Sequence, residues 1–127
     1  SGSWASSSSS PSSHWRHASM SDSGQYAVAG LAAGGIYYSS DYGASWAASD
    51  AIYAPYWIAI AFDASGQYGL ASIYDSSTGG IYQSDDFGAT WTMSYNQAKQ
   101  WRGLGGSSDG SKFIASGQSD VLYIADC

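Results

Sequence analysis

Residues 39–46 read Ser-Ser-Asp-Tyr-Gly-Ala-Ser-Trp, and residues 84–91 read Ser-Asp-Asp-Phe-Gly-Ala-Thr-Trp. Each stretch follows Gly-Gly-Ile-Tyr and one further residue. An aspartate carboxylate can accept hydrogen bonds from the backbone N–H groups of its own turn, and a glycine permits a bend that a Cβ would obstruct. A tryptophan at the end of such a turn can bury about 150–250 Å² between two sheets. We therefore predict two hairpin turns in which Asp41 and Asp86 have a structural role, rather than a catalytic or metal-binding one.

Three similar units begin at Trp15, Trp57 and Trp101, which are 42 and 44 residues apart. Each tryptophan is followed by a short apolar run, a turn with aspartate and glycine, and a second run. Tyr, Trp, Ile and Val favour strands, and four-stranded units repeating at this length are typical of propeller blades. The predicted strands are 15–20, 25–31, 35–39 and 45–49 in unit one, 57–62, 67–73, 80–84 and 90–94 in unit two, and 101–106, 112–117 and 120–125 in unit three.

The shared motif, S-x-D-x-G-x-[S/T]-W, resembles the Asp-box, which is the hairpin signature of sialidase-like β-propellers with BNR repeats. This resemblance implies an all-β fold of four-stranded antiparallel blades, with the motif between the third and fourth strands of a blade. It also implies a structural role for the box residues, which are Ser39, Asp41, Gly43, Trp46, Ser84, Asp86, Gly88 and Trp91.

The two ends of the chain look like halves of a third, degenerate box. Asp126 and Trp4 are five steps apart if the ends are joined, which is the spacing inside each intact box. Trp4 also precedes Trp15 by 11 residues, as the box residue Trp46 precedes Trp57. Unit three lacks a fourth strand, and three blades cannot close a ring of about 4–8 blades. We therefore expect the first strand of another chain to complete the third blade.

The predicted organisation is a single β-propeller segment. It consists of a swapped outer strand with a Ser-rich linker in 1–13, blade 1 in 14–50, blade 2 in 51–95, and three strands of blade 3 in 96–127. Two such chains would close a six-bladed ring as a two-fold, strand-swapped dimer. A nine-bladed ring of three chains, a head-to-tail filament, and excision from a longer propeller are the alternatives.

The composition limits the kinds of partner. A net charge of −6 argues against nucleic acid or an anionic membrane. The longest apolar run, 56–62, is too short to span a bilayer. Four Lys and Arg residues leave few sites for trypsin, which favours an extracellular or cell-surface location. Cys127 is the only cysteine, so it could form a disulfide only with another chain.

The sequence does not favour catalysis. In the sialidases, the site uses an arginine cluster, a Tyr nucleophile paired with Glu, and an acidic proton donor, whereas this chain has no Glu at all. Arg16 and Arg102 follow the first tryptophans of units one and three, and a two-chain ring would bring four arginines to its channel. His14 and His17 are too few ligands for a metal site. We predict no cofactor, no metal and no enzymatic activity; a glycosidase, which needs two positioned carboxylates, is the disfavoured alternative.

Binding or assembly is therefore the predicted function. Propeller ligands usually lie on the face opposite the box turns, where the loops between the second and third strands meet the loops between blades. Aromatic rings stack on sugars, and Asp and Asn pair with hydroxyl groups, so we predict a carbohydrate site there. Packing of these aromatic residues between blades, in a structural subunit with no small ligand, is the alternative. The candidate residues are Tyr53, Tyr56, Tyr74, Asp75, Tyr95, Asn96, Arg16 and Arg102.

Overall fold

A computed structural model describes residues 2–7, 9–11, 13–51, 56–74, 79–97, 99–118 and 121–126. The described residues form eleven strands in three antiparallel sheets. Sheet 1 contains β1 (Trp15–Met20), β2 (Ala27–Leu31), β3 (Ile36–Ser39) and β4 (Ala47–Ala48). Sheet 2 contains β5 (Trp57–Phe62), β6 (Gly69–Ile73), β7 (Ile81–Ser84) and β8 (Thr92–Tyr95). Sheet 3 contains β9 (Trp101–Gly106), β10 (Lys112–Gly117) and β11 (Leu122–Asp126).

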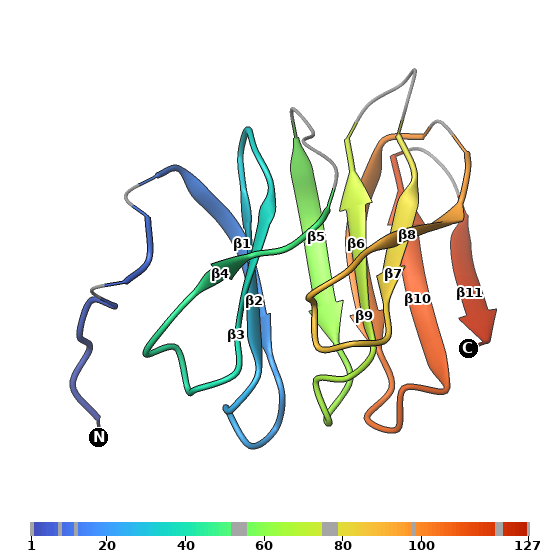
Figure 1. The fold of residues 1–127 in the computed structure, drawn as a ribbon. Helices are drawn as coiled ribbons and strands as arrows, with labels where there is room; N and C mark the ends of the chain where they lie inside the picture. Colours follow the sequence, from blue (N-terminus) through green and yellow to red (C-terminus); the bar gives the residue numbers. More distant parts are fainter. Residues whose placement is uncertain are drawn as a thin grey trace.

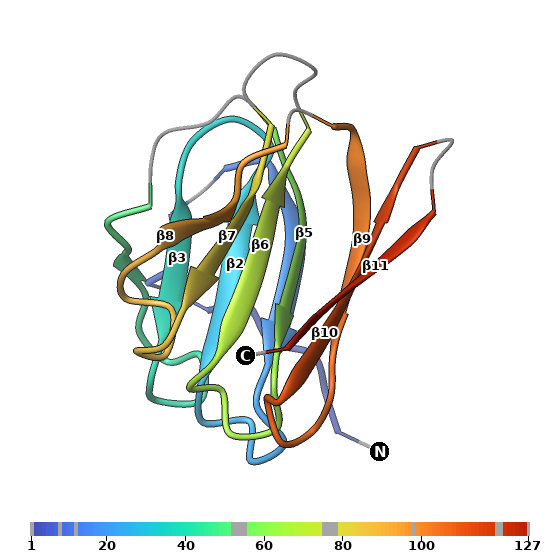
Figure 2. The ribbon, with the colours of Figure 1, turned by 90° about the vertical axis from the view of Figure 1, so that its right-hand side faces the viewer.

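The sequence predicted these strands well, since every strand end lies within two residues of its predicted position. Within each sheet the strands follow in chain order, so each pairs with its neighbour in the sequence. Figure 1 shows the three sheets side by side, and Figure 2 shows them from the side of sheet 3. No helix among the described residues is long and apolar enough to cross a membrane.

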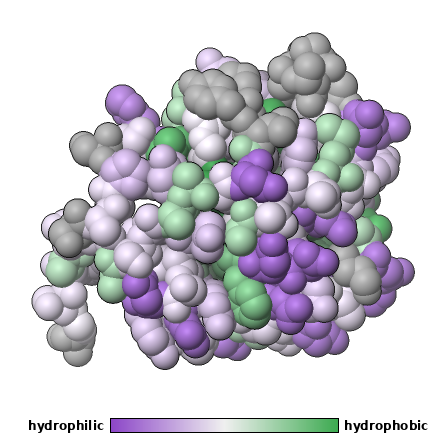
Figure 3. Space-filling model, viewed as in Figure 1, coloured by the Kyte–Doolittle hydropathy of each residue, from purple (hydrophilic) through white to green (hydrophobic). Residues whose placement is uncertain are grey.

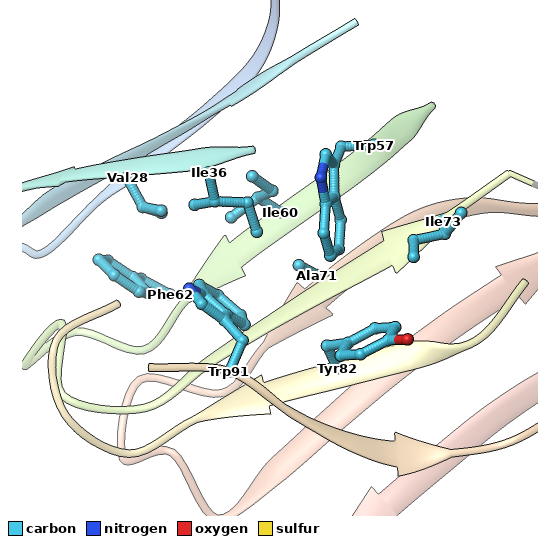
Figure 4. Close-up of a cluster of buried hydrophobic side chains, with 9 residues drawn as sticks. All are labelled: Val28, Ile36, Trp57, Ile60, Phe62, Ala71, Ile73, Tyr82 and Trp91. Atoms are coloured by element: carbon cyan, nitrogen blue, oxygen red, sulfur yellow. The ribbon is translucent and has the colours of Figure 1, made fainter. Parts of the chain in front are cut away.

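Sheets 1 and 2 are held together by a buried apolar cluster. Its members are Val28, Ile36, Trp57, Ile60, Phe62, Ala71, Ile73, Tyr82 and Trp91 (Figure 4). Val28 and Ile36 come from sheet 1, and the other members come from sheet 2. A smaller cluster joins sheets 2 and 3 through Leu70, Ile81, Trp101, Phe113 and Ala115. The core therefore lies between the sheets, as expected when each sheet hides its apolar faces against the next one.

Backbone hydrogen bonds also link the sheets at their turns. The N–H of Asp22 donates to the carbonyl oxygen of Ala64 at 2.9 Å, and the N–H of Ala64 donates to Ser108 at 3.1 Å. The N–H of Phe62 also donates to the hydroxyl of Ser19 in sheet 1 at 3.0 Å. These bonds fix the relative height of the three sheets, because each turn is tied to the next one.

The N-terminal segment does not belong to any of the three sheets. Residues 2–7 have no regular secondary structure, and Trp4 is fully exposed. The hydroxyls of Ser7 and Ser9 donate to the carbonyl oxygens of Gly43 and Ala44 in the turn of sheet 1. In Figure 1 the N-terminus lies beyond sheet 1 and the C-terminus lies at sheet 3.

Candidate functional site

The two box turns have the same hydrogen bonds. In residues 84–91, Asp86 accepts from the Ser84 hydroxyl at 2.9 Å, from the Thr90 N–H at 2.8 Å and from the Thr90 hydroxyl at 2.6 Å. The Ser84 hydroxyl in turn accepts from the N–H of Gly88 at 3.0 Å. The carboxylate thus uses its oxygens within its own turn, as a turn-locking role requires.

The first box turn, residues 39–46, repeats this arrangement. Asp41 accepts from the Ser39 hydroxyl at 2.9 Å, from the Ser45 N–H at 2.8 Å and from the Ser45 hydroxyl. Tyr42 and Gly43 have φ angles of 62° and 79°, in the left-handed region where glycine is favoured. Hydrogen bonds from Ser45 and Ser39 lower the pKa of the Asp41 carboxyl.

The box tryptophan of sheet 2 fills the boundary between sheets 1 and 2. The Trp91 indole donates to the carbonyl oxygen of Gly88 at 2.9 Å, and its ring belongs to the buried cluster of Figure 4. Around it lie Val28 and Ile36 from sheet 1, and Ala71 and Tyr82 from sheet 2. A tryptophan directly before the fourth strand β8 therefore completes the contact between sheet 2 and sheet 1.

The boundary between sheets 2 and 3 has a groove at the corresponding place. We call it the inter-sheet groove; its cavity volume is about 630 Å³. Leu70 and Ile81 line it from sheet 2, and Ala115 and Tyr123 line it from sheet 3. In sheet 2 the outer strand β8 also contributes, through Ser94 and the ring of Tyr95. The groove is mostly apolar and opens beside β11.

Four residues that line the groove are counterparts of four residues in the cluster around Trp91. Val28 lies four residues after Gly24, and Leu70 lies four residues after Gly66; both are turn glycines with positive φ angles. Ile36 and Ile81 each follow a Gly-Gly pair. Ala71 pairs with Tyr82, and the corresponding pair in sheet 3 is Ala115 with Tyr123. The groove is therefore the counterpart of the Trp91 site, one sheet further along.

The register of sheet 3 differs by one residue from the register that the spacing of Asp126 suggested. In sheet 2, Gly69 pairs with Ser84, which lies two residues before Asp86. In sheet 3, the counterpart of Gly69 is Phe113, which pairs with Ala125, one residue before Asp126. Asp126 therefore lies one position short of a box aspartate, and its carboxylate pairs with the ammonium group of Lys112 instead. The spacing and the strand register therefore differ by one residue at Asp126, and its assignment to a split third box stays a prediction.

Two of the three sheets present an open apolar face. On sheet 1, which we call the Trp15 face, Trp15 and Met20 are 37% and 62% exposed, and Trp46 is half-buried. On sheet 3, Ile114, Leu122 and Ile124 are 41%, 64% and 72% exposed, and we call them the Ile114 face. The face shown in Figure 3, by contrast, mixes hydrophilic and hydrophobic residues without one continuous apolar patch. The open apolar faces lie at the two ends of the row of sheets.

The residues predicted to bind a sugar lie in more than one place, as far as the structure describes them. Tyr53 and Asp75 lie outside the described residues. The Arg102 guanidinium lies 4.9 Å from the centre of the Tyr74 ring and donates to the Gln118 side chain at 2.7 Å. Tyr56 is exposed, and its carbonyl oxygen accepts from the N–H of Tyr74 at 2.9 Å. The structure thus brings these three predicted residues together, at one end of sheets 2 and 3.

The remaining candidates lie elsewhere. Tyr95 packs against the rings of Trp101 and Tyr123, with centres 5.9 and 6.1 Å apart, so it contributes to the boundary between sheets 2 and 3. Asn96 is exposed beside it. Arg16 lies on β1 with the Trp15 face, two sheets away from Arg102. The residue type alone does not tell whether an aromatic side chain packs between sheets or lies on the surface. The contacts in the structure show this.

No family model and no curated protein matches this sequence. Solved structures do match it. A GH74 enzyme of Niastella koreensis is 25% identical with a TM-score of 0.64, over 87% of this chain and 16% of that one. A protein of Agrobacterium tumefaciens assigned to TolB is 22% identical with a TM-score of 0.64, over 90% of this chain and 43% of that one.

A third structure, a complex of KlAtg21 with the coiled coil of AgAtg16, is 12% identical with a TM-score of 0.64, over 88% of this chain and 39% of that one. The GH74 enzyme and TolB are both β-propellers. The three sheets are therefore propeller-like blades. The chain spans less than half of the length of each of these structures.

Proposed function

We propose that the chain is an assembly module in which copies associate head to tail, with the Ile114 face of one copy against the Trp15 face of the next. One observation carries this proposal: the counterparts of these two faces already pack together inside the molecule. Trp57 and Phe62, which correspond to Trp15 and Met20, are 0% and 8% exposed in the contact with sheet 1.

The other side of the internal contact supports the same pairing. Val28, the sheet 1 counterpart of Ile114, is 0% exposed because sheet 2 covers it. Burying apolar surface contributes about 25 cal/mol per Å², and an exposed apolar patch on a folded domain marks an interaction surface. A second copy offers Trp15 and Met20, the counterparts of the sheet 2 residues Trp57 and Phe62 in the internal contact.

Head-to-tail association of this kind has two outcomes, which depend on the rotation between copies. If the rotation closes, two copies of three blades give one six-bladed ring, within the usual range of about 4–8 blades. If it does not close, the same contact continues as a filament. We propose the closed ring, because it leaves neither apolar face exposed. This role needs no catalytic residue; sugar binding and an extracellular location stay predictions.

Sedimentation velocity on the purified chain tests the proposal. We expect a species of twice the 13.3 kDa chain mass, which does not grow further with concentration. Met20→Asp should weaken the association at least tenfold, about 1.4 kcal/mol, because it places a charge in an apolar contact. Met93→Asp is the matched control, since Met93 is 46% exposed on β8, outside both open faces. A folded monomer at every concentration would overturn the proposal.

A further inference from the structure

The inter-sheet groove has the features of a binding site for one particular kind of partner. It repeats the surroundings of Trp91 with Leu70, Ile81, Ala115 and Tyr123 in place of the residues around that indole. Between sheets 1 and 2, the corresponding place is filled by Trp91, which directly precedes the fourth strand β8. By this correspondence, the groove is suited to a planar aromatic side chain.

The edge strand of sheet 3, β11, offers backbone hydrogen-bonding groups to an extended segment. Among the residues that the structure describes, β11 pairs on one side with β10 and has no strand on its other side. The equivalent strands β3 and β7 each pair with a fourth strand, β4 and β8. An open edge presents N–H and C=O groups to a further strand, and adding a strand is a common mode of peptide recognition.

We propose that Trp4 of a second copy occupies the inter-sheet groove, with its flanking residues added to β11 as the fourth strand of sheet 3. This proposal rests on the head-to-tail association described above. Its basis in the sequence is that Trp4 precedes Trp15 by 11 residues, as Trp46 precedes Trp57. A copy docked as the next blade thus places its Trp4 where the preceding sheet needs a fourth-strand tryptophan.

The conformation of the N-terminal segment agrees with this placement. Trp4 is fully exposed, although tryptophan usually contributes a large buried area. The segment is anchored on sheet 1 by Ser7 and Ser9, which leaves residues 2–6 to extend beyond that sheet. The two chain ends lie at opposite sides of the row of sheets in Figure 1, so Trp4 reaches the groove of another copy and not its own.

The decisive comparison is between Trp4→Ala and Trp4→Phe in the full chain, with the dimer dissociation constant measured by sedimentation equilibrium. Because Trp4 is exposed, neither change should alter the fold of a single copy. Trp4→Ala should raise the dissociation constant about 30-fold or more, which is about 2 kcal/mol, as expected for a buried aromatic anchor. Trp4→Phe should restore part of the affinity because it keeps an aromatic ring.

The groove side has its own variant. Ser94→Arg, at an exposed position that lines the groove, should weaken the association like Trp4→Ala by obstructing the entrance. Ser108→Arg, at an exposed position of the turn after β9, is the matched control. If Met20→Asp weakens the dimer and neither Trp4→Ala nor Ser94→Arg does, the head-to-tail contact stands and the Trp4 assignment is wrong.

Photo-crosslinking shows the position of residue 4 directly. With p-benzoylphenylalanine in place of Trp4 and a mixture of isotope-labelled and unlabelled chains, we expect crosslinks between copies, to peptides containing Leu70 or Tyr123. Crosslinks only within one copy, to the 43–46 turn, would overturn the proposal even if the chain is a dimer.

Discussion

Trp57 donates its indole N–H to the carbonyl oxygen of Gly34 in the neighbouring sheet, with a donor–acceptor distance of 3.1 Å. Both the ring and the hydrogen bond are buried. One side chain thus joins sheets 1 and 2 in two ways, through apolar contact and through a directional bond. Trp15, its counterpart on sheet 1, is 37% exposed.

Trp57→Phe should destabilise the chain by about 1–3 kcal/mol, because it removes the donor and leaves the Gly34 carbonyl oxygen buried without it. Trp15→Phe is the control and should cost less, since water can reach that position. Urea unfolding followed by circular dichroism measures both. Equal losses for the two variants would contradict the importance of the buried bond.

The paired residues Phe62 and Gly69 predict a second effect. A Cβ on Gly69 would lie 2.6 Å from the Phe62 ring, so Gly69→Ala should cost about 1–3 kcal/mol through overpacking. Phe62→Leu should relieve the clash, and a double-mutant cycle should give a coupling of about 0.5–3 kcal/mol. Gly35→Ala, where a Cβ meets nothing within 4 Å, is the control. Additive effects of the two substitutions would refute the clash.

The same pair recurs in sheet 3 with the residues exchanged. There Phe113 pairs with Gly106, and a Cβ on Gly106 would lie 2.6 Å from the Phe113 ring. A phenylalanine ring thus fills the corresponding space in both sheets, from the first strand in sheet 2 and from the second strand in sheet 3. Gly106→Ala should therefore destabilise the chain as Gly69→Ala does.

The turn-locking role of Asp86 predicts a third effect. Asp86→Ala removes the acceptor of the Ser84 hydroxyl and of both Thr90 donors, so we expect a loss of about 1–3 kcal/mol in the free energy of unfolding. Asp85→Ala is the matched control, because the adjacent Asp85 is exposed. Thermal unfolding compares the two variants. A larger loss for Asp85→Ala would argue against the locking role.

The pH dependence of stability follows from the aspartates in the turns. Hydrogen bonds from the Ser107 hydroxyl and from Ser111 lower the pKa of Asp109 to about 2. Burial raises the pKa of Asp86, but the hydrogen bonds from Thr90 and Ser84 outweigh it, so that pKa is also lowered. A carboxyl whose pKa is lower in the folded chain stabilises the fold in its ionised form.

The contribution of these aspartates to stability should therefore be constant down to about pH 5 and then be lost as the pH decreases toward about 2, so the melting temperature should fall over that interval. Asp109→Asn should make this fall shallower, because the substituted side chain does not titrate. Calorimetry between pH 5 and pH 2 measures the effect. A melting temperature that rises as the pH decreases over this interval would contradict the prediction.

The sequence predicted the strands closely because their apolar periodicity and turn residues are local signals. The spacing of Trp15, Trp57 and Trp101 predicted three repeated units, and the eleven strands lie within two residues of their expected positions. Both box motifs predicted turns whose carboxylates accept hydrogen bonds locally, since those partners are only a few residues away.

The spacing of residues along the chain does not fix the strand register or the contacts between sheets. Asp126 has the right distance to Trp4 across the joined ends, but the pairing of β10 with β11 places it one position short of the turn aspartates. Tyr95 has the residue type for a sugar site, and the structure adds that its ring packs against Trp101. Such outcomes depend on which strand edges meet, and no local pattern encodes that.

The sequence by itself determined the blade repeat and the two locked turns, because both depend on residues that are close along the chain. Only the tertiary structure decided which tryptophans are buried. Trp15 and Trp57 each begin the first strand of their sheet, yet one is 37% exposed and the other is 0% exposed. The reason is that a ring on the face of a sheet is buried only where a neighbouring sheet covers it. Sheet 1 covers Trp57, whereas Trp15 lies on the open face of sheet 1.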